Sequence, residues 1–190
     1  VEGITGIAPM DIAYATEFGY TIKLLAIAKV QDGEGARAPV EIEARVHPTM
    51  IPNESPLARV GGVYNAIQVT GDAVGDIMLY GRGAGSLPTA SAVVSDVVDI
   101  ARNVLTGATR RIPPCGFQAD QRRPLRIQPI EDLASLYYLR FMVRDKPGVL
   151  SQLSGLLGKH DISISSVLQR GRKAGQTVPV VMMTHTAVER

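Results

Sequence analysis

The feature that most constrains the fold is a run of ten almost continuously apolar residues, 21–30 (TIKLLAIAKV). The run is too short to cross a bilayer, and its lack of polar alternation predicts a strand covered on both faces. A turn signal follows at Asp32-Gly33, and residues 40–46 then alternate apolar with charged side chains. This alternation predicts an antiparallel neighbour with one buried, apolar face and one charged face.

The rest of the first hundred residues extends this sheet and adds a helix. Two more predicted strands, residues 64–70 and 76–80, are joined by a glycine-rich turn. Residues 47–52 contain two prolines and are predicted to leave the sheet, because proline lacks a donor for the strand ladder. Pro88 then opens a predicted helix over residues 88–102, whose apolar positions keep helical spacing.

The second half changes character after an irregular stretch. Residues 104–135 hold clustered prolines and arginines, which predicts a linker packed on the surface. Residues 136–190 follow the order strand, helix, strand, strand, and Pro147 is placed to occupy the first position of the helix. The predicted fold class is therefore α/β of the α+β kind: a mixed β-sheet domain with helices over residues 1–103, a linker, and a small sheet with one helix.

Composition limits the classes of function. The formal net charge is only +2, so nothing in the total demands nucleic acid or an anionic membrane as partner. The single cysteine, Cys115, cannot form an internal disulfide, which predicts an inert thiol and a cytoplasmic protein. No His, Cys or acidic residues fall at metal-ligand spacing, so no metal site is predicted. The arginine-rich linker leaves a polyanion site open, but its near lack of aromatic residues for base stacking favours a solvated linker.

A glycine loop precedes the predicted helix of the first half. Gly81, Gly83 and Gly85 stand in the sequence GRGAGS, and glycines there let backbone amides approach a phosphate at a helix N-terminus. Ser86, however, replaces the third glycine of the dinucleotide fingerprint, and no buried strand ending in an acidic residue follows. The residues alone leave two interpretations open: part of a dinucleotide site, or a tight strand-to-helix turn.

Four stretches of the first half resemble bacterial homoserine dehydrogenases, in order along the chain. They are VEGI at 1–4, EFGYTIKLL at 17–25, HPTMIP at 47–52 with GGVYNA at 61–66, and GRGAGSLPTASAVVSDVVD at 81–99. In that family the glycine loop lies beside the bound nicotinamide nucleotide. The resemblance assigns four cofactor-side residues: Gly83, Ala84, Gly85 and Thr89. It implies a substrate and oligomerisation domain over residues 1–103, and places the nucleotide-binding domain and the catalytic residues upstream of Val1, so no catalytic residue is expected here.

Residues 136–190 resemble an ACT domain, a ferredoxin-like βαββαβ module that binds amino acids. The match rests on FMVRDKPGVL at 141–150 and ISI at 162–164, and the final helix and strand of the module are expected to be missing. The resemblance makes Asp145 and Gly148 effector-binding residues, because free amides at a helix start can hold a carboxylate. The alternative is that Asp145 only caps the helix and Gly148 only fits the packing.

Together the resemblances imply a longer parent protein, of which this sequence is expected to be a piece cut at both ends. That protein would interconvert L-homoserine and L-aspartate 4-semialdehyde with NADP or NAD, bound mainly by the absent domain, in threonine and methionine biosynthesis. It would be a homo-oligomer, dimer or tetramer, with threonine feedback through the ACT domain, and the present chain alone is expected to be inactive. The alternative is a stand-alone amino-acid-binding regulatory protein, which would need Val1 and Arg190 as natural termini. A catalytic role for Lys23 is disfavoured, because a strand lysine more often keeps its stem in the core and its amine in water.

Overall fold

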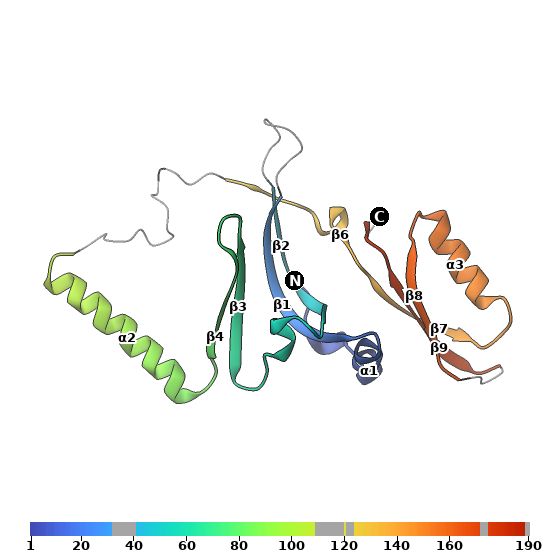
Figure 1. Ribbon diagram of the computed structural model, residues 1–190, viewed down its shortest axis with the longest axis horizontal. Coiled ribbons are helices and arrows are strands. Elements are labelled where there is room, and N and C mark those ends of the chain that lie inside the picture. The colour runs from blue at the N-terminus through green and yellow to red at the C-terminus, as the bar shows by residue number, and fades with distance from the viewer. Residues whose placement is uncertain (32–40, 109–119, 121–123, 172–174, 189–190) are drawn as a thin grey trace. The chain divides into compact units, whose positions relative to one another are not determined.

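A computed structural model describes residues 1–31, 41–108, 120, 124–171 and 175–188 (Figure 1). The chain divides into two compact units: one holds Glu2–Leu25 and Pro48–Pro124, and the other holds Val1, Ala26–His47 and Leu125–Arg190. The domain boundaries expected at 103/104 and 135/136 stay predictions. The predicted turn after residue 31, the Cys115 thiol and the arginines at 110, 111, 122 and 123 fall outside the described residues.

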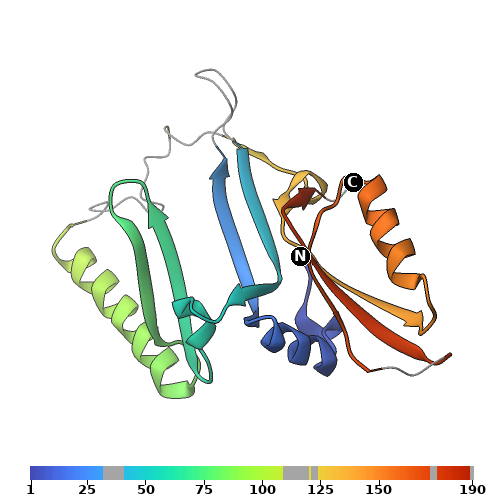
Figure 2. The same ribbon diagram turned by 45° about the vertical axis from the view of Figure 1, so that its right-hand side comes forward.

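The unit that carries the glycine loop is built around a β-hairpin. Its elements are η1 (Ile4–Gly6), α1 (Pro9–Glu17), the first part of β1 (Tyr20–Gln31), the last part of β2 (Glu41–Pro52), η2 (Pro56–Arg59), β3 (Tyr64–Gly71), β4 (Gly75–Arg82) and α2 (Ser86–Leu105). β3 and β4 pair antiparallel from Tyr64 with Arg82 to Gly71 with Gly75, and they lie side by side in both views (Figure 2). The two predicted strands and the predicted helix are therefore confirmed, the helix with three more residues at its C-terminal end and two more at its start.

Apolar surface in this unit is largely uncovered by the described residues. Leu24 is 49% exposed and Val30, in the other unit, 66%, and none of residues 20–30 is buried. The prediction that this strand is covered on both faces is wrong for the described chain, because several of its apolar side chains are exposed and none is buried. α2 likewise contains no buried residue. Among the described residues, no helix combines the length and apolar character needed to cross a membrane.

Strand β2 departs from the predicted pattern of one apolar and one charged face. Glu43 is only 4% exposed, whereas Ala44 on the opposite face is exposed. Arg45 Nε lies 2.8 Å from Glu43 Oε1, and Lys29 Nζ lies 3.8 Å from the same oxygen. The prediction that the charged side chains face water is therefore wrong at Glu43, since ion pairing compensates for the burial of its carboxylate.

One further prediction about this sheet is corrected, and the predicted linker adds a short strand to it. β2 continues through Pro48 to Pro52, so the chain does not leave the sheet at residue 47; a strand accepts proline where no ladder donor is needed. The predicted surface linker also joins the sheet: β5 (Arg126–Ile127) pairs in parallel with Glu41 and Ile42, giving the order β1–β2–β5. The prediction that the strands now seen as β1 and β2 are neighbours is confirmed.

The second unit contains the predicted order strand, helix, strand, strand. After β5 come η4 (Ile130–Asp132), β6 (Ala134–Ser135), β7 (Tyr138–Arg144), α3 (Val149–Lys159), β8 (Ile164–Gln169), β9 (Thr177–Thr184) and β10 (Ala187–Val188). β9 lies between β7 and β8, antiparallel to both. Leu157 of α3 packs with Val180 and Met182 of β9, which forms the small core of this unit. The α/β fold class predicted for the chain is confirmed.

Candidate functional site

The glycine loop is an open connection between β4 and α2. Every residue from 81 to 86 is exposed. Gly85 is the N-cap of α2, and no side chain caps this helix of 20 residues. The amide of Thr89 donates to the carbonyl of Gly85 at 3.1 Å, so the helical hydrogen bonding starts at that point. The loop therefore presents the first amides of a long helix to an open surface, which is the arrangement that binds anions.

Two glycines of the loop differ in what a side chain would meet: backbone strain at Gly85 and the Asn65 side chain at Gly83. Gly85 has a φ of 116° and a ψ of 149°, a conformation open essentially to glycine alone. Gly83 has no positive φ, but a Cβ built on it would lie 2.8 Å from Cγ of Asn65. Asn65 is not among the residues predicted from the sequence, where its only signal is its place in a strand that pairs with the loop's own strand. These local reasons for glycine leave the predicted cofactor roles of Gly83 and Gly85 as predictions.

The loop is attached to the start of β3. The amides of Gly83 and Ala84 both donate to the carbonyl oxygen of Val63, at 3.2 and 3.3 Å. Lys23 Nζ donates to the carbonyl oxygen of Val60, which lies three residues before Val63. The Lys23 ammonium therefore supports the turn that leads to Val63, and Lys23 is only partly buried.

An aromatic stack reinforces the base of the hairpin. The rings of Tyr64 and Tyr80 lie parallel, with centroids 4.9 Å apart, and the guanidinium of Arg82 lies 5.7 Å from the Tyr64 centroid. These three side chains share one face of the β3–β4 hairpin, because paired residues of antiparallel strands point the same way. The stack holds Arg82, the residue immediately before Gly83, in a defined position.

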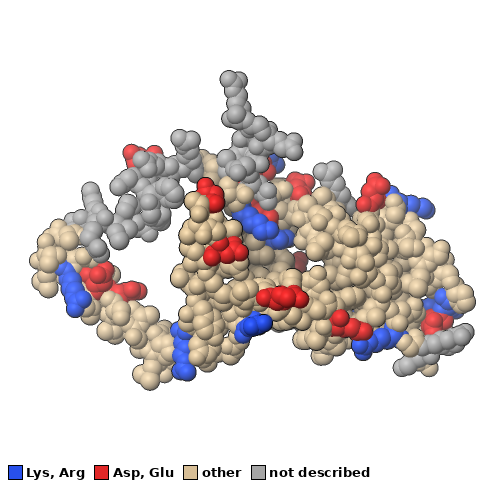
Figure 3. Space-filling view, viewed as in Figure 1, with Lys and Arg blue, Asp and Glu red and all other residues tan. Residues whose placement is uncertain are grey.

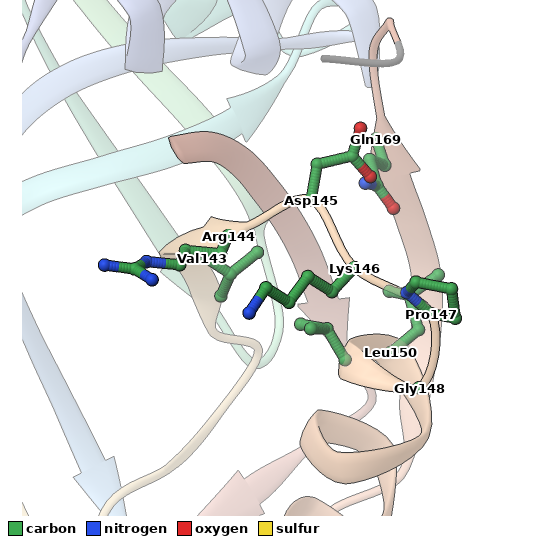
Figure 4. Close-up of a pocket in the computed structure, with 9 residues that line it drawn as sticks. Val143, Arg144, Asp145, Lys146, Pro147, Gly148, Leu150 and Gln169 are labelled. Atoms are coloured by element: carbon green, nitrogen blue, oxygen red, sulfur yellow. The ribbon is translucent and has the colours of Figure 1, made fainter. Parts of the chain in front are cut away.

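The second candidate site is a hollow of about 330 Å³ at the start of α3 (Figure 4). Its lining comes from the end of β7, the turn that follows, the first residues of α3, and Gln169 of β8. Asp145 and Gly148 both line it, as the sequence predicted for a shared effector site. Two backbone hydrogen bonds hold the turn: Asp145 N donates to Gln176 O at 2.9 Å, and Gly175 N donates to Asp145 O at 3.2 Å.

The hollow carries groups of both charges beside an uncapped helix start. Figure 4 shows Asp145 and Gln169 on one side of the turn and Lys146 on the other. No side chain caps α3, whose N-cap is Gly148 with a φ of 89°. Asp145 therefore does not cap the helix, and a Cβ on Gly148 would meet nothing within 4 Å, so backbone conformation rather than packing requires glycine there. The prediction that Pro147 takes the first helical position is wrong, since α3 begins at Val149.

These groups match the two ends of a free amino acid. The amides at the start of α3 and the Lys146 ammonium suit a carboxylate, while the Asp145 carboxylate and the Gln169 amide oxygen suit an ammonium group. On the face drawn in Figure 3, acidic and basic side chains are interspersed rather than gathered by sign.

Matches to two family profiles identify the class of protein, which joins a dehydrogenase segment to an ACT domain. The sequence profile described as Homoserine dehydrogenase matches residues 1–98, and the profile described as ACT domain matches residues 137–190. Because the first profile covers more than half of the chain, the protein belongs to the homoserine dehydrogenase family.

Relatives and solved structures agree with this assignment. The chain is 44% identical over its whole length to a homoserine dehydrogenase of Neisseria gonorrhoeae and 45% identical to one of Helicobacter pylori. It resembles a solved homoserine dehydrogenase from Thiobacillus denitrificans with a TM-score of 0.81 and 41% identity, over 98% of this chain and 40% of the other. The chain spans 42% of the length of each of the two curated relatives.

Proposed function

We propose that the protein carrying this chain is an NAD(P)-dependent homoserine dehydrogenase, which interconverts L-homoserine and L-aspartate 4-semialdehyde in the cytoplasm. The dinucleotide supplies the hydride acceptor or donor when bound. Within this chain, Gly83, Ala84, Gly85 and Thr89 would lie on the cofactor side, and the groups that move the proton would lie upstream of Val1. The protein would work as a homo-oligomer, a dimer or a tetramer.

The observation that carries this proposal is the open glycine loop at the uncapped start of α2. Residues 81–86 are all exposed, so a dinucleotide held mainly by protein outside this chain could reach the loop. A loop buried within its own unit would have removed the physical basis of the proposal. The uncovered apolar side chains of α2, which include Val93 and Val97, supply a surface on which such protein could pack.

Turnover of homoserine tests the proposal. The full-length protein, mixed with homoserine and NADP or NAD, should raise the absorbance at 340 nm, whereas a protein of residues 1–190 alone should not. Absence of turnover with either nucleotide would contradict the assignment of the activity. Turnover by residues 1–190 alone would contradict the placement of the catalytic residues outside this chain.

We further propose that the hollow at the start of α3 binds threonine as a feedback effector through Asp145 and Gly148. Its support is the pairing of an acceptor carboxylate with uncapped helix amides within one hollow. Binding there would lower activity at a separate catalytic site, which is a coupling between two sites.

Calorimetry with threonine and other amino acids on the full-length protein identifies the effector. Asp145→Ala should weaken threonine binding about 10- to 100-fold, since it removes a charge-assisted hydrogen bond. Glu131→Ala is the matched control, because Glu131 is an exposed acidic residue that does not line the hollow. Equal threonine affinity in Asp145→Ala and Glu131→Ala would exclude this site. Tighter binding of another amino acid would show that this amino acid, not threonine, is the effector. An amino-acid response without dehydrogenase turnover would support the alternative of a regulatory protein.

A further inference from the structure

A side chain from the neighbouring strand shapes the glycine loop. Asn65 of β3 stands in register with Gly81 of β4, and its side chain reaches over Gly83, two residues further along. A Cβ on Gly83 would lie 2.8 Å from Cγ and 3.2 Å from Cβ of Asn65, which is closer than such atoms pack. The nearest atom is the terminal Nδ2 of Asn65, so a residue with a Cβ at position 83 would displace the Asn65 carboxamide from its place over the loop.

We infer that Asn65 is a positioning residue, whose carboxamide, lodged in the place of a residue-83 side chain, holds the glycine loop in the form that presents the first amides of α2 to a dinucleotide. The inference rests on the proposed function and adds to it a residue outside the loop. Asn65 acts through Gly83, so it is a positioning residue rather than a catalytic one.

The attachment of the loop explains why a second contact matters. Gly83 and Ala84 share one acceptor, the carbonyl oxygen of Val63. Beyond the last strand pair, Tyr64 with Arg82, this acceptor holds the loop, and the Asn65 side chain adds a further contact at Gly83. Gly85 has a backbone conformation that is open essentially to glycine, and α2 begins directly after it. The position of the loop before Gly85 therefore sets where α2 starts.

The chemistry of Asn65 fits this role. Asn65 is exposed, and within the described part of the chain its carboxamide has no hydrogen-bond partner. Its contact with Gly83 is therefore one of shape, and removal of the side chain should loosen the loop without leaving a buried polar group unsatisfied. The expected consequence is weaker dinucleotide binding with little change in stability.

A double-mutant cycle in the full-length protein tests the inference. Asn65→Ala, Gly83→Ala and the double variant are titrated with NADPH and with NADH by fluorescence, and KM for homoserine is measured alongside. Gln68→Ala is the control, because Gln68 is an exposed residue of the same strand that points to the opposite face. Should Asn65→Ala fail to fold, Asn65→Ser takes its place with the same expected result.

Asn65→Ala should raise Kd for the dinucleotide about 5- to 20-fold, or about 1–2 kcal/mol, while KM for homoserine and the melting temperature change little. Gly83→Ala should raise Kd further, and the double variant should bind no more weakly than Gly83→Ala, because removal of the Asn65 side chain relieves the overlap. Equal Kd values for Asn65→Ala and the unaltered protein, or losses that simply add in the double variant, overturn the inference. If the unaltered protein binds neither dinucleotide, the proposed function fails and the inference fails with it.

Discussion

Glycines begin both helices that border the candidate sites. Gly85 precedes α2 and Gly148 precedes α3, and both have a positive φ that a side chain would strain. Gly83 has no positive φ, and a Cβ there would meet the side chain of Asn65 instead. At the scale of residues, the same amino acid therefore answers two different physical demands within one loop.

Gly85→Ala should destabilise the fold around the loop by about 1–3 kcal/mol, because alanine at this φ and ψ is strained. Gly81→Ala is the matched control: it has no positive φ, and its Cβ would meet nothing within 4 Å. We expect that variant to stay within about 0.5 kcal/mol of the unaltered protein. Urea unfolding of the full-length protein measures both, and equal effects of the two substitutions would refute the conformational argument.

The buried carboxylate of Glu43 makes a second prediction at this scale. Glu43→Gln should cost about 3 kcal/mol, because it leaves Arg45, whose side chain is 14% exposed, without its charge partner. Lys29→Ala should cost less than about 1 kcal/mol, since Lys29 is 57% exposed and 3.8 Å away. Thermal and urea unfolding followed by circular dichroism compare the two. If Lys29→Ala were as unstable as Glu43→Gln, the prediction would be wrong. Lys29 and Arg45 together, rather than Arg45 alone, would then compensate for the burial of the Glu43 carboxylate.

At the scale of elements, α3 attaches to its sheet through one side of its apolar stripe. Leu157 is 8% exposed and packs on Val180 and Met182, whereas its neighbour Leu156 is 55% exposed. The apolar stripe of α3 is therefore only partly covered within the described chain. Leu153 packs against the same core.

Leu157→Ala should destabilise the unit that holds the hollow by about 2–5 kcal/mol, through lost burial and the cavity left behind. Leu156→Ala, one residue away on the exposed side, should cost less than about 1 kcal/mol. Hydrogen exchange at the amides of β9, which lies against α3, reports the difference locally. Similar exchange rates in the two variants would mean that protein beyond the described residues covers Leu156.

At the scale of the whole molecule, the chain exposes more apolar surface than a lone chain tolerates. On α2 alone, Val93, Val97 and Val104 are 57%, 60% and 65% exposed. Exposed contiguous apolar surface of this kind marks a place where other protein packs. We therefore expect other protein to cover this face of α2.

A protein of residues 1–190 alone should therefore self-associate or unfold easily. Sedimentation velocity over a range of concentrations should show species larger than a monomer, and Val97→Lys with Val104→Lys should reduce them by charging the exposed face. Asp96→Lys, on the same helix but replacing an already charged residue, serves as the control. A stable monomer at all concentrations would contradict the prediction.

Local sequence was enough to determine the features that depend on neighbours in the chain. The β3–β4 hairpin, the helix after the glycine loop, and the order β7, α3, β8, β9 all follow from periodicity and from turn residues. The glycine loop and the Asp145–Gly148 turn could be identified as candidate sites for the same reason. Their roles came from family resemblance, since no spacing within the chain specifies a ligand.

Only the tertiary structure decided the features that join residues distant in sequence. Asn65 over Gly83, Lys23 on Val60, the pairing of β5 with β2, and the burial of Glu43 each depend on how separate segments meet. Local patterns assign an acidic side chain to water and a proline-rich linker to the surface, because a single segment carries no information about its partners. Burial and contact arise from the fold. The apolar run at residues 21–30 could therefore be recognised as a strand, but its sequence does not reveal what covers it.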